Sequence, residues 1–214
     1  MNAALILSGG IGSRFASNLP KQYHLLNGRM VIEYVIDACL SAASVDTVMI
    51  AAFDSEELRC LAAKYPVKTA PGGETRNRSL KNGLDALNAL GCDKVIVLDA
   101  VRPLVTPDLI SRYLSLLDEN NAVATTQAIT DSLGCLDAPV TDRSRYYLMQ
   151  SPEAFRFKDL YEAFDPESKL TEVTQQLKEG SSVYRYFDFP NNPKLTFPWD
   201  MDYCRLMLER MKEW

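Results

Sequence analysis

The stretch ALILSGGIGSRF at residues 4–15, followed by PKQY at residues 20–23, decides the fold. Its first four residues are apolar and predict a buried strand. Gly9, Gly10 and Gly12 come next, so the backbone can turn sharply and approach a ligand closely. Successive amide N–H groups in such a turn bind phosphate oxygens, and Arg14 and Lys21 add two cations. The stretch therefore predicts a cradle for a triphosphate directly after the first strand.

Other phosphate-binding loops fit this stretch less well. A Walker A loop ends in Gly-Lys-Ser/Thr, which is missing here. A dinucleotide-binding loop has a third glycine where Phe15 stands, and it needs an acidic residue about twenty positions later. An ordinary strand-to-helix turn remains as the alternative, and the two cations beside the glycines count against it.

Composition limits the class of protein. The chain has 214 residues, 47% of them hydrophobic, and a net charge of −5. This fits a single α/β domain over residues 1–214 and argues against a nucleic-acid or anionic-membrane partner. We expect neither a signal peptide nor a membrane span, because no apolar run is long enough and the chain starts on a core strand. Five dispersed cysteines are typical of reduced thiols in a cytoplasmic protein, and the single histidine, His24, argues against a histidine metal site or triad.

Hydrophobic periodicity predicts alternating strands and helices. The expected strands are residues 4–7, 47–53, 66–69, 94–98, 122–126 and 182–187, and the expected helices are 30–43, 55–64, 75–90, 157–164 and 169–179, with two more beginning at 106 and near 198. This order predicts a doubly wound, mostly parallel, Rossmann-like sheet. Residues 127–150 are polar and rich in turn residues, and we interpret them as a protruding β-arm that serves as a dimer contact or a lid.

Charged residues follow the strand at 94–98. Ligands of a parallel sheet bind beyond the carboxyl ends of its strands. Asp99 and Arg102 are therefore expected at the same edge of the sheet as the glycine loop.

Four short motifs occur in order along the chain, and together they are far more specific than any one alone. They are Gly10-Ile11-Gly12-Ser13-Arg14 with Pro20-Lys21-Gln22, Gly72-Gly73-Glu74-Thr75-Arg76-Asn77-Arg78-Ser79, Asp99-Ala100-Val101-Arg102-Pro103, and Asn192-Pro193-Lys194-Leu195-Thr196. With these motifs the chain resembles, over nearly its full length, the cytidylyltransferases that act on methylerythritol phosphate or ribitol phosphate.

The resemblance implies roles for individual residues. Arg14, Lys21 and Lys194 would be the catalytic cations. The implied nucleotide site consists of Leu7, Ser8, Gly9, Gly10, Gly12, Gly73, Glu74, Arg76, Ser79 and Ala100, and the implied acceptor site of Asp99, Arg102, Asp131, Ser132, Arg143 and Ser151. Mg²⁺ would be the cofactor, with Asp99 as its protein contact. The enzyme would be a homodimer whose arm carries Asp131, Ser132 and Arg143 to the acceptor phosphate of the other protomer.

The chain departs from the family pattern mainly on the acceptor side. Leu98 replaces a histidine, Gly134 an arm lysine, Glu153 a glutamine, and Glu172 stands where the family has aspartate. The acceptor therefore stays open between ribitol 5-phosphate and 2-C-methyl-D-erythritol 4-phosphate of isoprenoid biosynthesis. Val101 slightly favours ribitol 5-phosphate, because the ribitol-phosphate branch of the family often has valine or a similar residue at this position. Another alditol phosphate or a phosphonate for teichoic acid or capsule synthesis is the alternative. A non-catalytic nucleotide-binding module is the alternative from another class.

The expected chemistry joins CMP to a phosphate monoester and releases pyrophosphate. Such a monoester has a second pKa of about 6 and is largely a dianion at pH 7. It needs no general base, so fixed cations around the reacting phosphorus would supply most of the catalysis.

Overall fold

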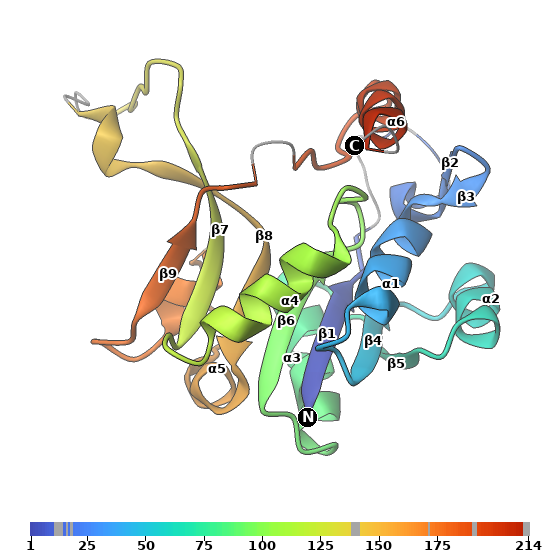
Figure 1. Ribbon diagram of the computed structural model, residues 1–214, viewed down its shortest axis with the longest axis horizontal. Helices are drawn as coiled ribbons and strands as arrows, with labels where there is room; N and C mark the ends of the chain where they lie inside the picture. Colours follow the sequence, from blue (N-terminus) through green and yellow to red (C-terminus); the bar gives the residue numbers. More distant parts are fainter. Residues whose placement is uncertain are drawn as a thin grey trace.

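A computed structural model describes residues 1–10, 15, 17, 19–137, 142–170, 172–189 and 192–211. Its centre is a seven-stranded sheet in the order β5-β4-β1-β6-β8-β7-β9 (Figure 1). These strands are β1 (Asn2–Leu7), β4 (Thr47–Ala52), β5 (Lys68–Pro71), β6 (Lys94–Asp99), β7 (Ala122–Ala128), β8 (Tyr147–Arg156) and β9 (Val183–Tyr186). Strand β8 is antiparallel to β6 and β7 and the other pairs are parallel, so the predicted mostly parallel sheet is confirmed.

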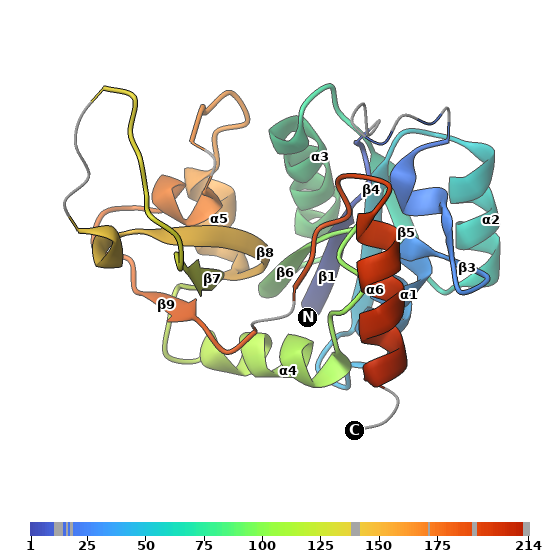
Figure 2. The same cartoon turned by 90° about the horizontal axis from the view of Figure 1, so that it is seen from above.

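Helices cover both faces of this sheet (Figure 2). They are α1 (Val31–Ser41), α2 (Glu56–Lys64), α3 (Arg76–Asn88), α4 (Pro107–Leu116), α5 (Phe157–Ala163) and α6 (Asp200–Arg210). Side chains alternate along β1: Ala4 and Ile6 pack with α1, α2 and α4, whereas Leu5 and Leu7 pack with α3 and α5. A strand covered on both faces is apolar throughout, which is why the first strand could be predicted from four apolar residues.

The expected helix at 169–179 is wrong. Residues 173–176 form a short 3-10 helix (η4, Val173–Gln176). The carboxylate of Glu172 accepts hydrogen bonds from the Thr174 hydroxyl and from the side-chain amide of Gln175, the latter at 3.1 Å. Local side-chain bonds of this kind compete with helix formation. A small hairpin of β2 (Leu25–Leu26) and β3 (Arg29–Met30) was not predicted.

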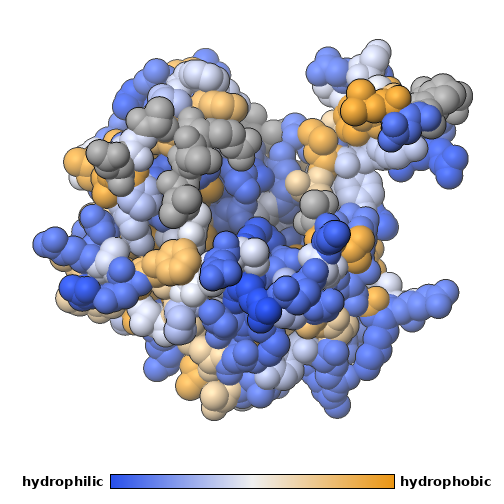
Figure 3. Space-filling view, turned by 180° about the vertical axis from the view of Figure 1, so that it is seen from behind, coloured by the Kyte–Doolittle hydropathy of each residue, from blue (hydrophilic) through white to orange (hydrophobic). Residues whose placement is uncertain are grey.

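The arm has a β-structured base and an irregular tip. Strands β7 and β8 pair as far as Ala128 and Tyr147. Beyond that pair, residues 129–137 and 142–146 contain no strand, and their regular structure is one 3-10 turn (η3, Arg143–Arg145). This tip stands clear of the rest of the molecule and carries apolar residues (Figure 3), of which Leu136 is fully exposed.

In the part of the chain that the structure describes, no helix is long and apolar enough to cross a membrane.

Candidate active site

A glutamine side chain holds the loop after β1 in place through hydrogen bonds to its backbone. Gln22 Nε2 donates hydrogen bonds to the carbonyl oxygens of Ser8 at 2.9 Å and Gly10 at 3.3 Å. Gln22 lies in a 3-10 helix (η2, Lys21–Tyr23), so the PKQY segment positions the first part of the loop and its lysine together. Two further residues predicted here, Gly12 and Arg14, lie outside the described residues.

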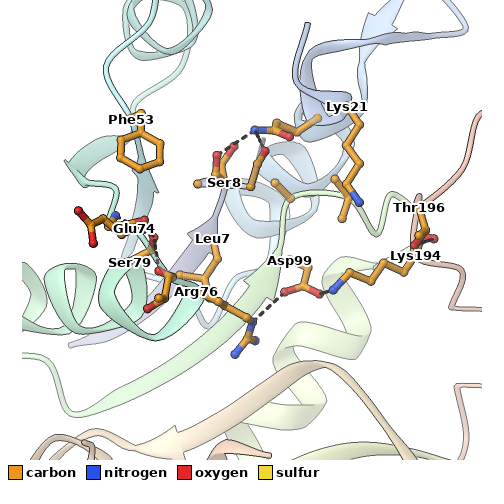
Figure 4. Close-up of a pocket in the computed structure, with 17 residues that line it drawn as sticks. Leu7, Ser8, Lys21, Phe53, Glu74, Arg76, Ser79, Asp99, Lys194 and Thr196 are labelled. Carbon is orange, nitrogen blue, oxygen red and sulfur yellow. Dashed lines mark hydrogen bonds and ion pairs between the residues drawn. The ribbon is translucent and has the colours of Figure 1, made fainter. Parts of the chain in front are cut away.

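A cavity of about 500 Å³ opens beside this loop (Figure 4). Most of the residues that line it come from β1, from α3 and the turn before it, from the end of β6 and from the C-terminal segment. The predicted residues that line it are Leu7, Ser8, Gly9, Gly10, Lys21, Gly73, Glu74, Arg76, Ser79, Asp99, Ala100 and Lys194. Five further residues line this cavity that the sequence analysis assigns to no site: Gln22, Phe53, Thr75, Val101 and Thr196. We refer to it as the nucleotide cavity, after the predicted nucleotide-binding residues that it brings together.

One end of the nucleotide cavity is built from tightly packed backbone. Ser79 Oγ accepts from the Gly73 amide at 2.9 Å and donates to the Thr75 carbonyl at 3.1 Å. A Cβ atom at Gly73 would lie 2.4 Å from Arg78 Cβ, and one at Gly9 would lie 2.8 Å from Ser79 Oγ. Gly73 requires glycine because a side chain there would collide with the backbone of the first turn of α3, whereas a side chain at Gly9 would displace the Ser79 hydroxyl.

Asp99 lies at the centre of a cluster of cations at the opposite end. Lys194 Nζ is 3.0 Å from Asp99 Oδ2, Arg76 Nε is 3.5 Å from Oδ1, and Arg102 Nε is 3.6 Å from Oδ2. Burial opposes ionisation of this carboxyl, yet the three cations hold its pKa well below its usual range. Asp99 therefore carries a full negative charge throughout the neutral pH range.

A second cavity, of about 650 Å³, adjoins the first. The two cavities share Arg76, Asp99 and Lys194. The predicted acceptor residues Arg102 and Ser151 line the second one, together with Arg145, Gln150, Glu153, Glu172 and Gln175 among others. We call it the acceptor cavity, and it adjoins the nucleotide cavity through the Asp99 cluster.

The other predicted acceptor residues are not at this site. Asp131, Ser132 and Arg143 lie in the arm and line neither cavity of the described chain. Arg143 instead donates to the carbonyl oxygens of Thr130 at 2.5 Å and Asp131 at 3.3 Å. A role for these residues in another protomer remains a prediction.

The C-terminal segment 192–196 crosses the site and binds three of its parts. Lys21 Nζ donates to the Leu195 carbonyl at 2.6 Å, and the Leu195 amide donates to the Val101 carbonyl at 3.0 Å. Arg102 Nη1 donates to the Asn192 carbonyl at 2.6 Å. Leu195 is fully buried, which fixes the segment across the end of β6 and brings Lys194 to Asp99.

Glu153 is a buried acid on the floor of the acceptor cavity. It is 3% exposed, its Oε2 is 3.8 Å from Arg76 Nη2, and its Oε1 has no hydrogen-bond partner among the described residues. The pKa of this carboxyl is raised to about 7, and burial is the largest cause. Arg76 opposes this increase, and the negative charges of Asp99 and Glu172 add to it. No local pattern in the sequence signals this, because the burial comes from the pairing of β8 between β6 and β7.

This raised pKa predicts how Glu153→Gln changes stability with pH. As pH rises from about 4.5 to about 7, the unfolded chain releases the Glu153 proton and the folded chain keeps it, so the wild type loses stability. The glutamine side chain of the variant cannot titrate. The free energy of unfolding of the variant, relative to wild type, should therefore increase by about 2–3 kcal/mol between pH 5 and pH 8. Urea unfolding at several pH values measures this difference.

Glu33 provides a control of opposite sign. Burial opposes ionisation of its carboxyl, but Lys64, Tyr65 and the Met30 amide lower its pKa. Its stabilising effect is present above the unfolded pKa and is lost as pH falls, so Glu33→Gln should lose stability relative to wild type as pH rises. Parallel pH profiles for wild type and Glu153→Gln would contradict the assignment of a raised pKa to Glu153.

The fold and the two adjoining cavities are those expected of an α/β nucleotidyltransferase. The family model described as IspD, 2-C-methyl-D-erythritol 4-phosphate cytidylyltransferase, matches residues 2–209, and the chain belongs to that family.

Individual relatives agree with this. The chain is 31% identical over 208 residues to a 2-C-methyl-D-erythritol 4-phosphate cytidylyltransferase of Cereibacter sphaeroides, covering 92% of both chains. It is 37% identical over 205 residues to a bifunctional IspD/IspF enzyme of Ruegeria, and it spans 54% of that enzyme's length. The structure of a 4-diphosphocytidyl-2C-methyl-D-erythritol synthase from Anaerococcus prevotii has the same fold, with a TM-score of 0.83 at 24% identity over 97% of this chain and 96% of that one.

Proposed function

We propose that this protein transfers CMP from CTP to 2-C-methyl-D-erythritol 4-phosphate and releases pyrophosphate. The observation that supports the proposal most directly is the pair of adjoining cavities that share Arg76, Asp99 and Lys194. A nucleotide in one cavity and a phosphorylated acceptor in the other would meet at this cluster. The relatives named for this acceptor support the choice of methylerythritol phosphate over ribitol phosphate.

Catalysis in this proposal is electrostatic. The acceptor phosphate attacks the α-phosphorus of CTP, and negative charge builds up between two groups that are already anionic. Lys194 stands between the two cavities and Lys21 beside the glycine loop, so both can stabilise that charge. A dianionic nucleophile needs no base, which agrees with a site whose described lining contains no histidine.

Mg²⁺ is part of the proposal as an ion carried by the triphosphate. Among the described residues there is no group of three or more His, Cys, Asp or Glu side chains that could hold a metal. Mg²⁺ commonly keeps several waters and binds one or two carboxylates together with substrate phosphates. Asp99, which is charged at neutral pH, fits the role of such a single carboxylate, and the ion would neutralise charge on the triphosphate.

We also infer a homodimer in the cytoplasm. The arm tip and the strand that leads from it offer Leu136, Tyr146 and Leu148 as exposed apolar residues, which supports the use of the arm as a contact between protomers. The dispersed cysteines support a reducing compartment.

Pyrophosphate release tests the proposed reaction. Purified protein with CTP and Mg²⁺ should turn over methylerythritol phosphate faster than ribitol 5-phosphate, glycerol phosphate or aminoethylphosphonate. Chelation of the metal with EDTA should abolish turnover, and added Mg²⁺ should restore it, because the charge of the triphosphate would otherwise be uncompensated. Turnover of another acceptor would correct the substrate. If CTP raises the melting temperature of the protein but no acceptor is turned over, the result would favour a non-catalytic nucleotide-binding module.

A further inference from the structure

Phe53 is an aromatic side chain that the proposed chemistry does not use. It follows directly after β4, whose residues 48–52 are all buried, yet Phe53 itself is 48% exposed. Single exposed apolar residues are common on protein surfaces, so exposure alone assigns no role. The surroundings of Phe53 give the further information.

The side chain lines the nucleotide cavity at a defined end. Phe53, Glu74 and Ser79 lie at one end of this cavity, and Lys21 and Lys194 lie at the other (Figure 4). The cations at the far end suit the triphosphate. The end beside Phe53 is therefore left for the uncharged nucleoside, whose base is the part farthest from the triphosphate.

Backbone packing fixes the position of Phe53. The Gly72 amide donates to the Ala52 carbonyl at 2.7 Å. A Cβ atom at Gly72 would lie 2.7 Å from Phe53 N and 3.2 Å from Phe53 Cγ, so glycine is required for this close approach. Phe53 Cγ thus lies close to Gly72, while about half of the residue's surface stays open.

We propose that the ring of Phe53 stacks on the cytosine base of CTP. This inference rests on the proposed function and assigns to the same site a residue that holds the base. An aromatic ring offers a flat apolar surface to the face of a base, and stacking of this kind tolerates different bases because each has a π-face. Phe53 should therefore contribute affinity for the nucleoside, while the polar groups at Gly73, Glu74 and Ser79 would contribute the choice of base.

Calorimetric titration with CTP, with UTP and with inorganic tripolyphosphate tests this. Phe53→Ala should weaken CTP binding by about 5- to 150-fold. Binding of UTP should weaken by a similar factor, which leaves the preference for CTP unchanged. Tripolyphosphate should bind equally to variant and wild type, since it has no base. Phe53→Trp should retain the affinity, and Phe53→Leu, which is apolar but not aromatic, should fall between.

Phe187→Ala is the matched control. Phe187 is 49% exposed and follows strand β9, and it does not line the nucleotide cavity. This variant should bind CTP as the wild type does. Equal CTP affinity for wild type and Phe53→Ala, or equal losses of CTP and tripolyphosphate affinity, would overturn the assignment of Phe53. A wild-type protein that bound no CTP would instead overturn the proposed function, so the two failures are distinguishable.

Discussion

Lys194→Ala is expected to lower kcat by about 10²–10³ and to change the KM for CTP much less. Removal of one fixed charge donor from a transition state typically has an effect of this size. Lys194 Nζ is 3.0 Å from Asp99 Oδ2, and the residue lines both cavities. It is therefore placed to bind charge that develops during transfer between them. Steady-state pyrophosphate release, with CTP and acceptor varied in turn, separates the two constants.

Lys178→Ala serves as the control for this experiment. Lys178 forms an exposed ion pair with Glu162 at 2.8 Å, and neither residue lines either cavity. Its replacement should leave kcat unchanged. Turnover of Lys194→Ala within about twofold of the wild-type rate would contradict the catalytic role of Lys194.

Asp99→Asn is expected to lower the free energy of unfolding by about 3–5 kcal/mol at pH 7, in addition to its effect on activity. Loss of one member of a buried ion pair leaves the other charge without compensation. Arg102 is 7% exposed, and burial already lowers its pKa against the opposing effect of Asp99. Asparagine keeps the shape of the side chain and removes the charge. Urea unfolding at pH 7 measures the loss.

Two further variants make this test specific. Asp54→Asn removes an exposed ion pair with Arg59, which solvent screens, and should therefore lower the free energy of unfolding far less than Asp99→Asn does. Adding Arg102→Met to Asp99→Asn should recover part of the lost stability, because no buried charge then remains uncompensated at Arg102. Equal small losses for Asp54→Asn and Asp99→Asn would show that the cluster contributes little to folding.

The stabilising effect of Asp99 should also depend on pH. Its folded pKa is depressed, so the contribution is present above the ordinary carboxyl pKa and is lost as pH falls towards the folded value.

Local signals in the sequence predicted most of the secondary structure, whereas most of the residues expected at the nucleotide site followed from the family resemblance. Helix α2 begins after Ser55, whose hydroxyl caps the Leu58 amide as its sequence position suggests. Helix α3 buries Leu80, Leu84 and Leu87, spaced as a helix requires. The glycine loop and Asp99 could be expected at one edge of the sheet because both lie at the carboxyl ends of neighbouring parallel strands, and their binding roles stay predictions.

The acceptor cavity depended on contacts that no local pattern encodes. Ser151 and Glu153 belong to β8, a strand that the sequence analysis does not predict. Their position follows from antiparallel pairing, in which Glu153 lies opposite both Val97 and Ala124. Such pairing joins residues far apart in sequence, so neither the burial of Glu153 nor its raised pKa could be predicted from neighbouring residues.

The crossing of the site by residues 192–196 has a consequence for how activity is lost. Lys21 and Leu195 are 174 positions apart in sequence, and their hydrogen bond holds the segment that follows the glycine loop to one of the last segments of the chain. The segment contains none of the seven strands of the sheet. Its detachment would therefore displace Lys194 while the strands stayed paired. Local opening generally needs less free energy than global unfolding. Inactivation by heat or denaturant can therefore precede the melting of the sheet, and enzyme activity reports the integrity of the C-terminal segment more sensitively than circular dichroism does.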